Sequence, residues 1–306
     1  MDAKTVYLTA TAAQVVLPFL LCLLLRPLEV ALPLRQAALP LPLRWWANMP
    51  LAMASNALAI LGSYTLAGRI GSYGASLNLF SLAAAPLPGP LKFVVGLLII
   101  DALAYGLHVL SHKSGLLWRL HQIHHSDNEF DASTGLRHQP LEGLVSLYVL
   151  TFFFGLLGMP FLVIAAYGTL SAMHGVLSHA NVAIPPRLDG VLRWLIVTPD
   201  MHRLHHSAEP NEYDSNYGQL FPFWDWLFRT LRRKSRVELA KMPLGLANAP
   251  DAGKMSAIQL TLLAFAPNQE RSGNSRNSRK SQWSSVARSS VVMRQTGRPK
   301  KAKRTR

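Results

Sequence analysis

The sequence is poor in cysteine and in charge, and both shortages narrow what the chain can be. Cys22 is the only cysteine, so disulfides, cysteine-type zinc sites and iron–sulfur clusters are excluded. The sequence also lacks a glycine-rich phosphate loop and a nucleophile elbow. Only 15% of the residues are charged, whereas 50% are hydrophobic, so the question becomes where the apolar residues lie.

Long stretches of the chain have no charged residue, or only one. Residues 6–25 and 49–68 contain none, and residues 93–110 contain only Asp101. Each stretch is long enough to cross the hydrocarbon of a bilayer, which is about 30 Å thick and takes roughly 20 helical residues. A secretory signal peptide is the alternative for the first stretch. However, this stretch has no small-residue cleavage site and continues into Arg26, so a retained helix is expected.

Residues 144–173 form a fourth uncharged block, interrupted by Gly158, Met159 and Pro160. These residues predict two shorter helices joined as a hairpin rather than one overlong span. The expected fold is therefore all-α, a polytopic transmembrane helical bundle with a cytoplasmic histidine-rich cap. The cytoplasmic side is inferred from residues 26–44, which hold three arginines, against two basic residues in 69–92.

The net charge of +15 belongs mainly to one end of the chain. Residues 268–306 contain twelve Lys or Arg and one acidic residue, Glu270. This segment has few large apolar residues and is expected to be disordered. It could contact anionic lipid head groups or nucleic acid, or have no specific role. Nucleic acid is not the expected partner of the chain, because the charge is a property of the tail and not of a domain.

Histidine is concentrated in one part of the sequence. All eleven histidines lie between His108 and His206. Three groups have regular spacing: His108 and His112 in HVLSH, His121, His124 and His125 in HQIHH, and His202, His205 and His206 in HRLHH. The remaining three are His138, His174 and His179.

Residues at i, i+3 and i+4 share one face of a helix, so each histidine group should direct its imidazoles to one side. One zinc ion is saturated by four imidazoles, so eight to ten converging histidines require two metals. A single HxxxH pair is more often a coincidence than a metal site, but three such groups together favour a site. Nearby carboxylates are few, which disfavours a ferritin-like centre. Asp101 precedes His108 by seven residues, and we expect it to orient a histidine.

From about residue 101 to residue 230 the chain resembles the fatty acid hydroxylase superfamily (sterol desaturase family), membrane di-iron proteins with histidine boxes. The resemblance rests on an ordered set of motifs: DALAYGLHVLSH, WRLHQIHHSD, STGLRHQPLE, LSHANV, TPDMHRLHHS, NYG and WDWLFRT. Two positions depart from the common pattern, Val109 where many members have Arg and Asp131 where many have Asn. Neither is a ligand, so they bear on the subfamily and the substrate.

The resemblance implies two iron ions, with zinc as a possible substitute in purified protein. The implied ligands are His108, His112, His121, His124, His125, His202, His205 and His206, with His179 as a ninth and His174 as a further one. His138 is assigned with Asp101 as a catalytic residue. For His138 and His174, roles as a ligand, as a partner of a ligand or as a structural residue stay open.

The resemblance also implies an oxidoreductase that hydroxylates or desaturates a lipid C–H bond, in a fatty acyl, sterol-like or related substrate, with O2. Electrons would come from outside, from a ferredoxin, cytochrome b5 or a reductase, because the chain has no flavin, haem or iron–sulfur motif. The expected location is the cell inner membrane or the endoplasmic reticulum. The expected division is transmembrane helices over 1–90, a catalytic domain over 91–250 and a C-terminal segment over 251–306.

Three other functions compete with this interpretation. A histidine-rich membrane metal transporter is the main alternative, although its ligands would lie near the middle of several spans. A zincin-type metallohydrolase needs Glu beside the first histidine, and here Val109, Gln122 and Arg203 stand in that position. A catalytically inactive relative that keeps metal for folding is the third.

Overall fold

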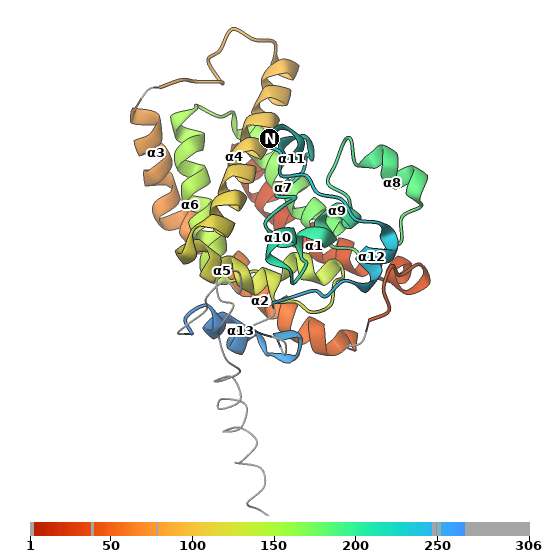
Figure 1. Cartoon of the computed structure of the whole chain (residues 1–306). Helices are drawn as coiled ribbons and strands as arrows, with labels where there is room; N and C mark the ends of the chain where they lie inside the picture. The colour runs from red at the N-terminus through yellow and green to blue at the C-terminus, as the bar shows by residue number, and fades with distance from the viewer. Residues whose placement is uncertain (1–2, 38–39, 78, 247–248, 250–251, 267–306) are drawn as a thin grey trace, which may run out of the picture. The chain divides into compact units, whose positions relative to one another are not determined.

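Helices dominate the computed structural model, which describes residues 3–37, 40–77, 79–246, 249 and 252–266 (Figure 1). Within these ranges there is no β-strand, only two isolated β-bridges. The predicted all-α class is therefore confirmed. The basic tail, residues 268–306, lies outside the described residues.

Four helical stretches of the described chain are long and apolar enough to cross a membrane: Thr5–Ala31, Leu41–Ser76, Gly89–Lys113 and Phe161–Ser178. They comprise α1 (Ala3–Ala31), α2 (Leu41–Gly62) with α3 (Gly68–Ser76), α4 (Gly89–Lys113) and α7 (Phe161–Ser178). The segment Ser63–Ala67 is a π-helix that joins α2 to α3. The three spans predicted from uncharged stretches are confirmed, and each helix is longer than its predicted range. The chain is therefore a membrane protein.

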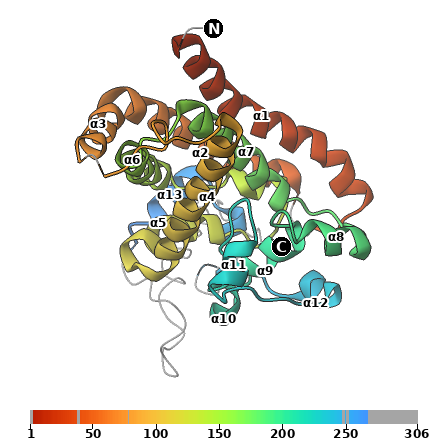
Figure 2. The ribbon, with the colours of Figure 1, turned by 90° about the horizontal axis from the view of Figure 1, so that it is seen from above.

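The predicted interruption near Gly158 is also confirmed. Helix α6 (Pro140–Leu156) ends before it and α7 begins after Pro160. Gly158 has φ +51°, and a Cβ there would lie 2.4 Å from the Oγ of Ser81. A side chain at this position would therefore be strained and crowded. The two helices pack mainly against other elements, α6 against α2 and α3, and α7 against α1 (Figure 2).

Small residues allow α6 and α3 to approach closely. A Cβ on Gly155 would lie 1.9 Å from the carbonyl oxygen of Gly71, and one on Gly74 would lie 2.3 Å from that of Phe152. Close backbone contact through glycines is a common way of packing helices in membranes, where burial from water gives no driving force.

The remaining helices are short (Figure 1). They are α5 (Gly115–His125), η2 (Ala132–Leu136), α8 (Pro186–Leu192), α9 (Pro199–His205), α10 (Pro210–Tyr213), α11 (Phe223–Leu227), α12 (Arg236–Lys241), η3 (Ala252–Lys254) and α13 (Ala257–Leu263). The side chain of Ser114 caps α5 by accepting a hydrogen bond from the Leu117 amide. Helix α5 packs against α4, and α9 packs against α7.

The first two helices contact the histidine-rich segments directly. The carboxyl of Glu29 accepts hydrogen bonds from the amides of Ala132 (2.7 Å) and Asn181 (2.9 Å). The guanidinium of Arg44 pairs with the carboxylates of Asp127 (2.8 Å) and Asp131, and all three side chains are buried. These contacts cross the domain boundary predicted at residue 90, and the division into three domains stays a prediction.

Replacing Arg44 with alanine should lower the free energy of unfolding by about 3–5 kcal/mol, because two buried carboxylates would lose their shared cation. The measurement is the thermal unfolding midpoint of the purified protein in detergent. Arg187→Ala is the matched control, since Arg187 is exposed, and it should leave the midpoint almost unchanged. Equal midpoints for the two variants would contradict this role of Arg44.

Candidate metal centre

Nine of the eleven histidines lie in two groups, and all nine are buried. The first metal group is His108, His112, His121, His125 and His205. The second metal group is His124, His179, His202 and His206. Within each group the ring nitrogens that could bind an ion lie within 4.8 Å of one another.

Helical spacing explains which histidine joins which group. Residues four apart lie on the same side of a helix, and the pairs His108 and His112, His121 and His125, and His202 and His206 each stay together. The middle histidine of each HxxHH motif turns to the other group, His124 to the second and His205 to the first. The expectation that each motif would direct all its imidazoles to one site is therefore wrong, because both motifs are shared between the two groups.

In the second metal group the Nε2 atoms converge on one point. The Nε2 of His179 lies 3.0 Å from that of His202, 3.0 Å from that of His206 and 3.2 Å from that of His124. One N–H proton can satisfy only one of these three contacts. A cation among them satisfies all four nitrogens, since a metal–nitrogen bond of about 2.0–2.1 Å places neighbouring ligands roughly 3 Å apart.

The ring nitrogens of the first metal group also converge. The Nε2 of His121 lies 3.2 Å from that of His108 and 3.2 Å from that of His125. The Nε2 of His205 is buried and has no hydrogen-bond partner among the described residues. Buried nitrogen acceptors that face one another without enough protons are costly, and a metal ion removes this cost.

Hydrogen bonds on the opposite ring nitrogen fix the orientation of four of these histidines. Backbone carbonyls accept from Nδ1 of His108 (Tyr217, 2.8 Å), His205 (Ser215, 2.7 Å), His124 (Arg137, 3.3 Å) and His179 (Gly175, 2.5 Å). A carbonyl can only accept, so the proton is on Nδ1 and the Nε2 lone pair remains for a metal.

Burial keeps the imidazoles neutral, which is the form that binds metal. Burial lowers the pKa of His179 to about 3. Burial and the neighbouring imidazoles hold the pKa well below the usual range for His124, His125, His202, His205 and His206. These side chains would therefore not have to release a proton at neutral pH before binding an ion.

Glu142 holds His121 of the first metal group, and the sequence motifs did not predict this role. Its carboxylate accepts from the Nδ1 of His121 at 2.6 Å, and its other oxygen lies 3.4 Å from the Nδ1 of His138. Glu142 follows His138 by four residues at the start of α6, so the spacing was available as a signal. Carboxylates in this position orient a ligand and increase its basicity.

His138 belongs to neither metal group. Its ring stacks on that of His124, with centroids 4.4 Å apart and planes 8° apart. Burial alone would lower its pKa, but the Glu142 carboxylate outweighs this and raises the pKa above its usual value. His138 therefore contacts the second metal group by stacking on His124. It is linked to the first metal group through Glu142, which accepts from His121.

Two other predicted residues do not reach the metal groups. The Nε2 of His174 contacts the carbonyl oxygen of Val197 at 2.9 Å, so the geometry gives no support for His174 as a ligand.

Asp101 contacts no histidine. Its carboxyl accepts from Tyr167 Oη (2.7 Å), the amides of Leu220 (3.1 Å) and Phe221 (3.2 Å), and Trp224 Nε1 (2.9 Å). The expectation that Asp101 orients a histidine is corrected accordingly.

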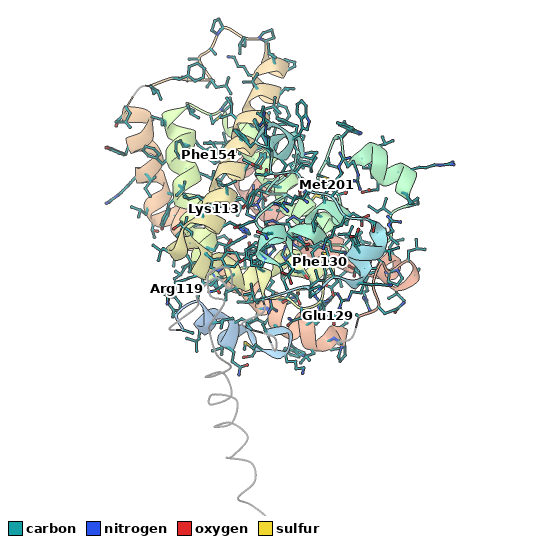
Figure 3. The ribbon with its side chains drawn as sticks, in the orientation of Figure 1. Lys113, Arg119, Glu129, Phe130, Phe154 and Met201 are labelled. Carbon is teal, nitrogen blue, oxygen red and sulfur yellow. The ribbon has the colours of Figure 1, made fainter. Side chains whose placement is uncertain are left out.

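Arginine and phenylalanine side chains enclose the second metal group. Arg137, whose carbonyl holds His124, donates to the Asn48 side chain (3.0 Å) and to the Ala252 carbonyl (3.0 Å). Phe130, which is labelled in Figure 3, stacks on His179 with ring centroids 5.2 Å apart. The Arg203 guanidinium lies over the Phe130 ring, 4.4 Å from its centroid. Arg137 and Arg203 are fully buried, so this side of the group is closed to water.

Comparisons with known proteins agree with this site. Residues 93–230, which contain all eleven histidines, match the family described as fatty acid hydroxylase. The chain is 32% identical to an ornithine lipid hydroxylase of Rhizobium tropici, over 49% of this chain and 44% of that protein. It is 27% identical to an alkylglycerol monooxygenase of Xenopus tropicalis, over 53% of this chain and 35% of that protein.

A very-long-chain aldehyde decarbonylase of rice (Oryza sativa subsp. indica) is 29% identical over 50% of this chain and 25% of its own length. The chain thus spans less than half the length of each of these three relatives. No solved structure matches the chain.

Proposed function

We propose, from the fatty acid hydroxylase domain that residues 93–230 form, that the chain is a membrane-bound di-iron oxygenase. Its reaction would be hydroxylation or desaturation of a C–H bond in a lipid, using O2 and external electrons. The observation that carries the proposal is the convergence of nine buried histidines into two metal groups on a bundle of membrane helices.

The donor set is compatible with iron. Imidazole suits iron, zinc and copper, and thiolate ligands, which would favour zinc or an iron–sulfur cluster, are absent from both groups. The first metal group would hold one ion with five histidines and the second would hold the other with four. When bound, the two irons would supply the activation of O2 for oxidation of the lipid. Zinc could replace iron in purified protein.

The protein's own residues would orient the ligands and exclude water. Glu142 and the backbone carbonyls hold the Nδ1 protons, and Phe130 and Arg203 close one side of the second group. A narrow cleft between α4, α5 and α6 leads to Glu142 and is lined mainly by Leu107, Leu117, Leu120 and Val145. In this structure the cleft holds only about 10 Å³, roughly one water, so its apolar lining would have to open to admit an alkyl chain from the bilayer to the first metal group.

Electrons would come from a ferredoxin, cytochrome b5 or a reductase. The histidine site would face the cytoplasm, in the cell inner membrane or the endoplasmic reticulum, as the arginines of residues 26–44 favour. A metal transporter receives no support, because the two groups are enclosed and the relatives are named as lipid hydroxylases and monooxygenases.

Replacing both His121 and His124 with alanine removes one ligand from each metal group and should abolish bound iron and product together. The assay uses the chain in lipid nanodiscs with a chemical reductant, and measures oxygen uptake, oxidised lipid by mass spectrometry and iron content. Arg187→Ala is the control and should match the unaltered chain. Full oxygen uptake and product in the double variant would refute the proposal.

A further inference from the structure

The segment after the last histidine group carries large apolar side chains on its surface although it lies outside the four spans. Trp226 is 70% exposed, Leu227 is 55% exposed and Phe228 is 58% exposed. They lie in and directly after α11, a helix of only five residues. Three consecutive exposed apolar residues, two of them aromatic, are unfavourable in water and indicate a contact surface.

This segment contacts the middle of α4, one of the four membrane helices. Asp101 lies twelve residues from either end of α4. Its carboxyl accepts from the amides of Leu220 and Phe221 and from the indole of Trp224. An ionisable group at the centre of a span is expensive unless it has a role, and here the role is to bind a second segment of the chain.

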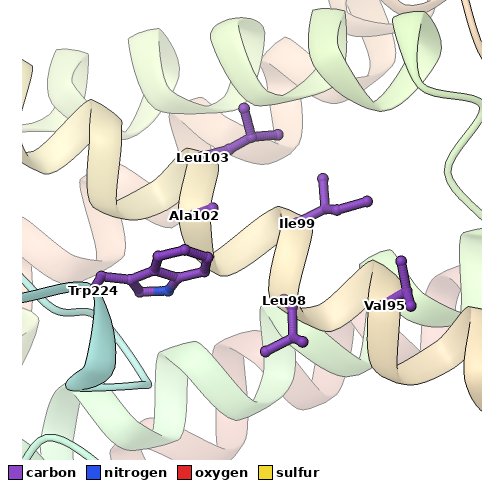
Figure 4. Close-up of a pocket in the computed structure, with 6 residues that line it drawn as sticks. All are labelled: Val95, Leu98, Ile99, Ala102, Leu103 and Trp224. Atoms are coloured by element: carbon purple, nitrogen blue, oxygen red, sulfur yellow. The ribbon is translucent and has the colours of Figure 1, made fainter. Parts of the chain in front are cut away.

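Other contacts place the same segment along the central turns of α4. Trp224 and five α4 residues line an apolar groove of about 350 Å³: Val95, Leu98, Ile99, Ala102 and Leu103 (Figure 4). Phe228 stacks on Tyr105, with ring centroids 5.4 Å apart. Helix α4 has 25 residues and is therefore about 37 Å long, more than the roughly 30 Å of hydrocarbon, so its central turns lie inside the bilayer.

Irregular backbone at that depth requires its polar groups to be satisfied within the protein. Asp101 satisfies the amides of Leu220 and Phe221, as stated above. Asp225, which is fully buried, accepts from the amides of Tyr217 (2.7 Å) and Gly218 (2.8 Å). The two carboxyl groups therefore remove the main penalty for placing this segment in hydrocarbon.

Exposed arginines follow the aromatic residues. Arg229, Arg232 and Arg233 are all exposed. Aromatic residues followed by arginines are typical of a chain that returns from the hydrocarbon to the head groups, where long basic side chains can reach the interface.

We propose that residues 219–228 form a re-entrant loop that contacts the acyl chains of the bilayer, with Asp101 as its anchor on α4. This goes beyond the proposed reaction and does not depend on it. Tyr217, whose carbonyl holds His108, comes two residues before the loop, so the loop is joined directly to a partner of the first metal group.

The test measures the depth of a spin label on the full chain in phosphatidylcholine nanodiscs. Single-cysteine variants are made on a Cys22→Ser background: Leu227→Cys in the loop, Val94→Cys on α4 as the lipid control, and Val237→Cys on α12 as the water control. Val94 is 51% exposed and Val237 is 64% exposed, so all three labels are accessible in the isolated chain. Collision with O2, which concentrates in lipid, is compared with collision with a water-soluble nickel chelate.

The label at position 227 should resemble that at 94, with a several-fold higher ratio of oxygen to nickel accessibility than at 237. A ratio equal to that at 237 would place the loop in water and overturn the proposal. Shielding from both reagents would mean that protein covers the loop, and would overturn it as well. Iron content, measured on the same samples, reports separately on the metal centre.

A second variant tests the anchor. Asp101→Ala should move the label at position 227 toward nickel accessibility and leave the label at 94 unchanged. Asp101→Asn keeps an acceptor oxygen and should have a smaller effect, which makes it the control if the alanine variant does not fold. An unchanged ratio in both variants would remove Asp101 from the proposal.

Discussion

Replacing His179 with alanine should reduce the bound metal from two ions per chain to one and abolish lipid oxidation. The Nε2 of His179 lies 3.0–3.2 Å from the ring nitrogens of His124, His202 and His206, so it is the common neighbour in the second metal group. Its loss leaves three imidazoles and a water-accessible fourth position, and the affinity should fall enough for this ion to be lost during purification. The five histidines of the first metal group are unaltered, so one ion should remain. The measurement is iron per chain in the purified protein.

His174→Ala is the matched control for that experiment. His174 is also buried and lies only five residues earlier, but its ring contacts the carbonyl of Val197 and not a metal group. This variant should keep two ions and lose only about 1–3 kcal/mol of stability, from the unsatisfied carbonyl. Two ions retained in His179→Ala, or one ion lost in His174→Ala, would show that the second group is assigned to the wrong residues.

Removing the carboxylate of Glu142 should have the second largest effect. Glu142→Ala deprives His121 of the acceptor at 2.6 Å that fixes its ring, and the metal affinity of the first metal group should fall roughly 10–100-fold. The measurement is the chelator concentration at which the ion of the first metal group is lost, with a chelator of known affinity. The second group has no contact with Glu142 except through the stacked ring of His138, so its ion should leave at an unchanged chelator concentration.

Two further variants separate the possible causes of such a loss. Glu142→Gln keeps an oxygen that can accept from His121, and it should retain more metal than Glu142→Ala. His138→Ala removes the other partner of Glu142, together with the ring that stacks on His124, and should leave the affinity of the first group close to normal. Equal metal retention in all three variants would contradict the orienting role of Glu142.

The membrane helices could be predicted because their signals are local. A run without charge must be long enough to cross hydrocarbon, and the turn at Gly158 and Pro160 interrupts the fourth run wherever the rest of the chain lies. Only the lengths differed, since α2 continues through a π-helix into α3.

The histidines of the centre could also be predicted, but not their division into two groups. Spacing of three and four residues brings imidazoles to one side of a helix, yet each residue adds a rotation of 100°. That rotation separates His124 from His121 and His125, and His205 from His202 and His206. Which side faces which ion depends on how α4, α5, α7 and α9 pack, and a motif does not contain that information.

The partners of the site depend on contacts between distant segments. Asp101 was expected beside a histidine one to two turns along α4, and it instead accepts from amides about 120 residues later. Arg44 reaches Asp127 and Asp131 from another helix. Such carboxylates and arginines are visible in a sequence only as charges in unusual places, without an indication of their partners.

The central claim is that nine histidines form two adjacent metal sites, and a crystal of the iron-loaded protein measured at the iron absorption edge tests it directly. The account predicts two anomalous peaks, one among His108, His112, His121, His125 and His205 and one among His124, His179, His202 and His206. A single peak, or peaks outside these two groups of rings, would contradict it.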